Sequence, residues 1–198
     1  GVLVIITLLL ANAMGLAQTN AKRMLAYSSV SHAGYLGLIF FGANSLSVYN
    51  LAFYLFAYSL ATVGVFMTLI WVEKLKRETS FEAFKGLAKS EPLLAVVTAV
   101  SLLSMAGIPL TAGFVAKFNI FAQAMNGAAF LVLIAVIGSA LSIAYYLKLI
   151  ISMFFHTETT FKSSEKVSIT YNIIAVFIIV AILAIGIYPD LFKVQFGL

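Results

Sequence analysis

Lys117 is the residue with the clearest capacity for chemistry in this sequence. It lies in AGIPLTAGFVAKFNIF (106–121), a stretch apolar enough to sit in a lipid bilayer, and no acidic residue lies near it in sequence. Ionisable groups at such depth usually face the protein interior and often belong to proton or ion pathways. The sequence therefore predicts a lysine that takes up and releases protons. The alternatives are a lysine that snorkels to the interface and one that serves only packing.

The residues that precede Lys117 predict a break in its helix. Gly107, Pro109 and Gly113 interrupt the apolar segment 92–125, which as a single helix would be about 51 Å long, against a bilayer core of about 30 Å. Proline removes a backbone donor and clashes with the preceding turn. Backbone groups freed inside a bilayer must be satisfied by protein or by water in a cavity. We expect a broken helix, with Lys117 about 14 Å from its outer end.

A second polar face lies in the segment 24–43. Ser28, Ser31, His32 and Tyr35 recur at helical spacing and so share one side of a helix. Such a face either holds helices together or lines a hydrated proton path, with His32 as the group that titrates near neutral pH. Lys22 stands at the start of this helix, where it serves as an interfacial anchor or lies at a channel mouth.

These residues must be positioned by a bundle of membrane helices. The chain has 198 residues, of which 63% are hydrophobic and only 10% charged, whereas soluble domains carry about a quarter charged residues. We predict an all-α polytopic transmembrane bundle, residues 1–198 forming one domain with one discontinuous span. The six expected spans are roughly 1–16, 24–43, 48–72, 92–125, 128–155 and 168–189. Because the sequence begins inside an apolar run, we expect it to be a piece of a longer chain.

The loops predict orientation. All lysines and arginines outside the spans, except Lys193 near the C-terminus, fall in the loops 17–23, 73–91 and 156–167. Basic loops stay in the cytoplasm, so these loops are predicted to be cytoplasmic and the C-terminus to lie outside. Topology therefore explains the net charge of +5 without a nucleic-acid partner. The 73–91 loop carries apolar residues at helical spacing and predicts a short amphipathic helix on the cytoplasmic surface.

Metal and catalytic chemistry find little support in this chain. It has no cysteine, and its two histidines lie far apart in sequence, which disfavours a metal cluster. We found no phosphate-binding loop, nucleophilic triad or paired carboxylates in the sequence. The acidic residues fall in loops or at span ends, so a counter-charge for Lys117 is expected from elsewhere.

Two motifs carry a resemblance to a known family. LLANAMGLAQTNAKRMLAYSSVSHAGYLGLIF (9–40) and LLSMAGIPLTAGFVAKFNIF (102–121) resemble the antiporter-like membrane subunits of respiratory complex I, the NADH–quinone oxidoreductase. The resemblance covers nearly the whole chain and matches the last six of fourteen helices. The pattern around Lys117 and YYLK at 145–148 are most similar to N-type members, because M-type members have glutamate at the Lys117 position and L-type members have a lysine in the helix matching 48–72.

The resemblance implies a function and partners. Lys117 would be the lysine of the discontinuous helix, passing protons outward, and Lys22 would match a recurrent family lysine. The chain would be a proton-translocating subunit in the bacterial inner membrane, beside other membrane subunits, with an enzyme activity that belongs to the assembly. No cofactor is expected here; quinone, NADH, flavin and iron–sulfur clusters would lie elsewhere in the complex. Alternatives are a subunit of a cation/proton antiporter or membrane hydrogenase, and a structural scaffold.

Overall fold

The computed structural model describes residues 1–156 and 167–193, and the secondary structure of these residues is helical apart from one isolated backbone bridge. The predicted all-α polytopic bundle is confirmed, and three helices (α3, α6 and α7) are long and apolar enough to cross a membrane. Much of the predicted basic loop 156–167 lies outside the described residues. The helices are α1 (Val2–Leu16), α2 (Ala21–Leu36), the 3₁₀ turn η1 (Gly37–Phe40), α3 (Ser47–Lys76), the 3₁₀ turn η2 (Phe81–Phe84), α4 (Leu87–Ser90), α5 (Pro92–Ala106), α6 (Ala112–Phe155), α7 (Ile169–Ile187) and α8 (Asp190–Lys193).

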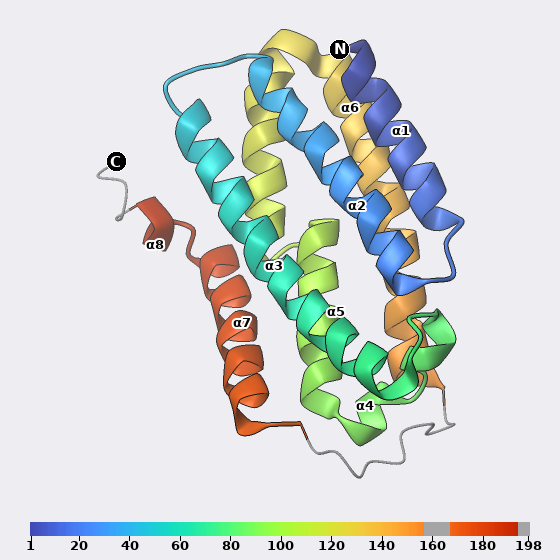
Figure 1. The fold of residues 1–198 in the computed structure, drawn as a ribbon. Helices are drawn as coiled ribbons and strands as arrows, with labels where there is room; N and C mark the ends of the chain where they lie inside the picture. The colour runs from blue at the N-terminus through green and yellow to red at the C-terminus, as the bar shows by residue number, and fades with distance from the viewer. Residues whose placement is uncertain (157–166, 194–198) are drawn as a thin grey trace.

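Helix α6 consists of two antiparallel arms. Ala128 has the non-helical angles φ −158° and ψ 54°, and the chain reverses there. Figure 1 shows the reversal at the same end of the bundle as the N-terminus. We call 112–127 the first arm and 129–155 the return arm. The sequence placed this turn at Asn126–Gly127, next to where it is found, so the predicted boundary between the fourth and fifth spans is correct.

The predicted break in the fourth span is also present. Helix α5 ends at Ala106, and Gly107 caps it in the left-handed conformation with φ +84°. The chain then passes through Pro109 before Thr111 caps the first arm of α6, its side chain accepting a hydrogen bond from the Phe114 N–H. In Figure 1 α5 stops partway along the bundle and the first arm of α6 continues from there. The 92–125 segment is therefore two half-helices, as its length requires.

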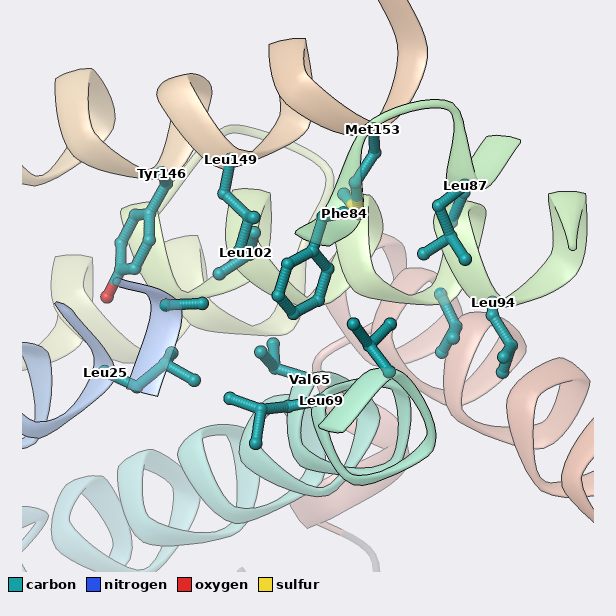
Figure 2. Close-up of a cluster of buried hydrophobic side chains, with 14 of the residues drawn as sticks. Leu25, Val65, Leu69, Phe84, Leu87, Leu94, Leu102, Tyr146, Leu149 and Met153 are labelled. Carbon is teal, nitrogen blue, oxygen red and sulfur yellow. The ribbon is translucent and has the colours of Figure 1, made fainter. Parts of the chain in front are cut away.

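Segment 73–91 differs from the expected surface helix. Helix α3 runs on to Lys76, and the rest forms the short turns η2 and α4. Phe84 and Leu87 are fully buried and pack in an apolar cluster with Leu69, Leu149 and Met153 (Figure 2). The apolar residues of this segment share one face, as their spacing predicts. That face packs against other helices of this chain rather than lying on lipid headgroups.

Hydrogen bonds of Gln123 connect the helices at the other end of the bundle, where α6 reverses. Gln123 in the first arm of α6 donates to the Ile39 carbonyl and to Ser47 Oγ, both at 2.9 Å. Its own oxygen accepts a hydrogen bond from Asn50 Nδ2, also at 2.9 Å. One side chain thus joins η1, α3 and α6 where Figure 1 shows the long connection between α2 and α3.

Candidate functional site

Lys117 is held inside the bundle by uncharged groups. Its side chain lies in the first arm of α6, and the residue is only 4% exposed. Its Nζ donates to the Ala106 carbonyl at 3.0 Å and to Ser139 Oγ at 2.9 Å. The ring of Tyr35 lies beneath it, with the centroid 4.6 Å from Nζ, a geometry that favours a cation. Snorkelling to the interface is therefore not how this lysine is accommodated.

The helix break supplies the principal acceptor. The last carbonyls of a helix have no partner within it and carry partial negative charge. Because α5 stops at Ala106, this carbonyl is available to Lys117. Gly107 keeps the approach open, since a β-carbon there would lie 2.9 Å from Lys117 Cδ. On the other side of the break the Gly113 N–H donates to Ser104 Oγ at 3.1 Å, and a β-carbon at Gly113 would overlap the Ser104 carbonyl.

His32 and Lys117 line the same cavity. His32 Nδ1 and the Tyr54 hydroxyl are 2.7 Å apart, and the Tyr58 ring lies against the imidazole with centroids 4.5 Å apart. The volume open to the centre of a water molecule is about 10 Å³, close to what one buried water requires. Ser104 and Met105 of α5 complete the wall. The arrangement can therefore place one water between an imidazole and an ammonium.

The predicted serine face is buried as expected, but its members have separate partners. Ser31 Oγ accepts a hydrogen bond from Asn12 Nδ2 at 2.7 Å, and Asn12 Oδ1 accepts one from the Tyr145 hydroxyl at 3.2 Å. Ser28 pairs with the Tyr146 hydroxyl. These contacts join α1, α2 and the return arm of α6. Both readings of the face, packing and polar path, thus have groups to support them.

Sequence reasoning missed three contributors. Asn12, fully buried in α1, was not singled out, although a lone asparagine in an apolar run was a usable signal. Tyr54 and Ser139, in the predicted spans 48–72 and 128–155, were not singled out either. What distinguishes them, contact with His32 and with Lys117, depends on neighbours that lie 22 residues away in sequence in both cases.

Lys22 lies apart from the Lys117 cluster. Its Nζ forms an exposed ion pair with Glu73 at 2.9 Å. It also lines a groove of about 240 Å³ together with Tyr58 and Met105. Because these two residues line the His32–Lys117 cavity as well, the groove and the cavity adjoin. Lys22 therefore lies in a groove that adjoins the buried cavity.

Among the residues that the structure describes, Lys117 has neither an acidic partner nor a metal site beside it. In residues 1–156 and 167–193 the hydrogen-bond acceptors of its ammonium are a carbonyl and a hydroxyl. In the same part of the chain, the structure shows no group of three histidine, cysteine or acidic side chains placed to hold a metal ion.

A buried ionisable group behind a broken helix, in a polytopic bundle, is a construction typical of membrane transport proteins. Residues 1–142 match the family model described as NADH:quinone oxidoreductase/Mrp antiporter, TM. The chain belongs to this family.

Relatives and solved structures agree with that assignment. The chain is 37% identical over 188 residues to NADH-quinone oxidoreductase subunit N of Flavobacterium psychrophilum, covering 94% of this chain and 40% of that protein. It is 35% identical to a chain in the structure of respiratory complex I from Thermus thermophilus with bound aureothin, with a TM-score of 0.83 and coverage of 96% and 43%. A chain of the archaeal membrane-bound sulfane sulfur reductase matches at 27% identity and a TM-score of 0.84, covering 96% of this chain and 38% of that one. The sequence thus spans about two-fifths of the length of these proteins.

Proposed function

We propose that this chain is part of an N-type antiporter-like subunit of NADH–quinone oxidoreductase, and that Lys117 carries protons across the membrane. The observation that supports this most directly is the burial of Lys117 at a helix break, against neutral oxygens, beside a cavity shared with His32. The similarity to subunit N proteins supports the choice of assembly. Quinone reduction in other subunits would drive the transfer.

The chemistry assigned to the residues follows from their contacts. Tyr54 engages His32 Nδ1, which leaves the other ring nitrogen to exchange a proton through a water in the shared cavity. Lys117 receives that proton, and the Ala106 carbonyl and the Tyr35 ring stabilise the resulting ammonium. Lys22 and the groove beside it would form the mouth of this path. Ser28 and Ser31, with Tyr35, hold α2 in register.

The partners follow from the same proposal. They are the neighbouring antiporter-like membrane subunits, the lipid bilayer and protons. NADH, flavin, iron–sulfur clusters and quinone would be bound by other subunits. In the bacterial cell membrane the loops 17–23 and 73–91 would face the cytoplasm and the C-terminus the outside.

A second candidate is a subunit of a cation/proton antiporter without a redox partner. The likeness to a chain of the Mrp complex from Dietzia, at 22% identity and a TM-score of 0.81, shows that this fold occurs there too. The redox assembly is favoured because relatives such as the Flavobacterium psychrophilum protein are named NADH-quinone oxidoreductase subunit N. Proton pumping that requires NADH oxidation separates the two.

Lys117→Met in the full-length protein, assembled in its complex and reconstituted in vesicles, tests the proposal. We expect NADH-driven proton pumping to fall at least 10-fold with assembly intact. Lys117→Arg should fail as well, because a guanidinium does not release its proton. Lys148→Met is the matched control: this lysine lies near the end of the return arm and donates to the Leu16 carbonyl at 2.7 Å. Pumping that persists in Lys117→Met would overturn the proposal and leave a structural scaffold.

A further inference from the structure

We propose that Ser139 is the positioning residue that keeps Lys117 in place in both of its protonation states. The inference rests on the proposed function and adds a residue to it. Ser139 comes from the return arm of α6 and is half-buried, whereas Ala106 and Tyr35 reach Lys117 from α5 and α2.

Three atoms form a closed triangle. Lys117 Nζ lies 3.0 Å from the Ala106 carbonyl oxygen and 2.9 Å from Ser139 Oγ, and Ser139 Oγ lies 3.0 Å from the same carbonyl oxygen. A hydroxyl has one proton and two lone pairs, and a carbonyl can only accept. The Ser139 proton therefore points to Ala106, and its lone pairs face Lys117. This arrangement suits an ammonium, which has only protons to offer.

Loss of the proton changes what Lys117 needs. A neutral amine keeps two N–H donors and gains one lone pair that can accept a hydrogen bond. The Ala106 carbonyl cannot donate to that lone pair, and the Tyr35 ring attracts only the charged form. The Ser139 hydroxyl can rotate and donate its proton to Nζ from the position it already occupies. Of the three groups in contact with Nζ, Ser139 is thus the one that can accept a hydrogen bond from the ammonium and donate one to the lone pair of the amine.

The consequence concerns where the amine goes after it releases a proton. Lysine has four rotatable side-chain bonds, so a neutral amine held only by its hydrogen bond to the Ala106 carbonyl would be less firmly fixed at the cavity wall. Retention by Ser139 keeps Nζ beside the cavity shared with His32. The next proton then arrives at a lysine that has not moved. Ser139 acts through Lys117 and need not carry the proton itself.

Ser139→Ala in the full-length complex, reconstituted in vesicles, tests this inference against two matched variants. We expect NADH-driven pumping to fall about 5- to 10-fold and the pH profile of pumping to move. Ser139→Thr keeps the hydroxyl and should retain most of the pumping. Ser142→Ala removes a buried serine one turn further along, whose hydroxyl donates to the Ser139 backbone carbonyl at 2.6 Å, and should leave both measurements unchanged.

Three results would overturn the inference. These are wild-type pumping with an unchanged pH profile in Ser139→Ala, an equal loss in Ser139→Thr, or a loss in Ser139→Ala that matches a drop in thermal stability while the pH profile stays fixed. Lys117→Met, measured in parallel, separates this inference from the proposed function. If Lys117→Met abolishes pumping and Ser139→Ala does not change it, only the role of Ser139 is wrong.

Discussion

Gly107 and Lys117 pack directly against each other, so that a β-carbon on the glycine would lie 2.9 Å from the lysine Cδ. The break and the buried cation are therefore one structural unit. Gly107 takes the left-handed conformation that ends α5, and the end of α5 releases the carbonyl that Lys117 binds. Changes at either residue should be felt at the other.

Gly107→Ala should disturb both stability and transport. A non-glycine residue in the left-handed region costs about 1 to 2 kcal/mol, and the added methyl must displace Lys117. We expect a lower melting temperature in detergent and a several-fold loss of pumping. Gly86→Ala is the control, because Gly86 has a similar φ of +71° at the start of α4. Equal pumping in the two variants would show that the contact with Lys117 has no functional weight.

Tyr54→Phe should weaken pumping with little effect on assembly. The change removes the hydroxyl 2.7 Å from His32 Nδ1, so the imidazole loses the contact that fixes its orientation. A loss of about 10-fold is expected, smaller than the roughly 10²- to 10⁴-fold contribution of a proton-transfer group itself, because Tyr54 only orients His32. Tyr27→Phe on the same helix as His32 is the control. If pumping in the two variants matches the wild type, His32 does not depend on Tyr54 for proton exchange.

Gln123→Leu should destabilise the end of the bundle where α6 reverses. It deletes three hydrogen bonds, two of them fully buried, and leaves the Ile39 carbonyl and the Asn50 amide without their partner. A loss of about 2 kcal/mol in the free energy of unfolding is expected. Gln18→Leu serves for comparison, because Gln18 makes one exposed hydrogen bond to Met14. Thermal unfolding in detergent measures both, and a loss no larger than that of Gln18→Leu would contradict the role of Gln123.

Glu91→Gln should raise stability at neutral pH. Burial raises the pKa of Glu91, which precedes α5, while a hydrogen bond from the Val167 N–H partly offsets this. The folded protein then binds the proton more tightly than the unfolded chain, so stability falls as pH rises from about 4.5 through the raised pKa. The variant should melt higher than wild type at about pH 7 and lose that advantage at about pH 4.

The control for this prediction is Glu78→Gln, a change at an exposed carboxylate just after α3. It should shift the melting temperature less than Glu91→Gln does. A pH dependence that is identical in Glu91→Gln and wild type would rule out Glu91 as its source.

Much of this fold was predictable because its determinants are local. Apolar runs about as long as the bilayer core is thick fix the spans, and Gly107 with Pro109 marks the break within a residue or two. The end of α3 was less accessible, because charged residues such as Lys74 and Lys76 favour helix as readily as loop. The turns at 81–90 depend on the packing of Phe84 and Leu87 against helices that are distant in sequence. The periodicity of the sequence does not predict such contacts.

The site was predictable in its central residue only. Lys117 stands out because burying an ammonium in an apolar segment is costly and therefore indicates a function. Its partners do not stand out, because a serine or tyrosine in a membrane helix usually serves to hold helices together. Ser139 and Tyr54 gain their meaning from which side chains they face, and that is decided by the packing of α2, α3 and α6.

The apolar cluster of Figure 2 also bears on how a membrane potential would be distributed across the protein. In this cluster the side chains of Leu25, Leu69, Phe84 and Leu149 lie together with Tyr146. A dry hydrocarbon layer does not conduct, so a membrane potential falls mainly across it, at about 2.3 kcal/mol per charge for each 100 mV. Under the proposed function, η2 and α4 would therefore lie within an insulating layer, and protons would enter through the groove beside Lys22.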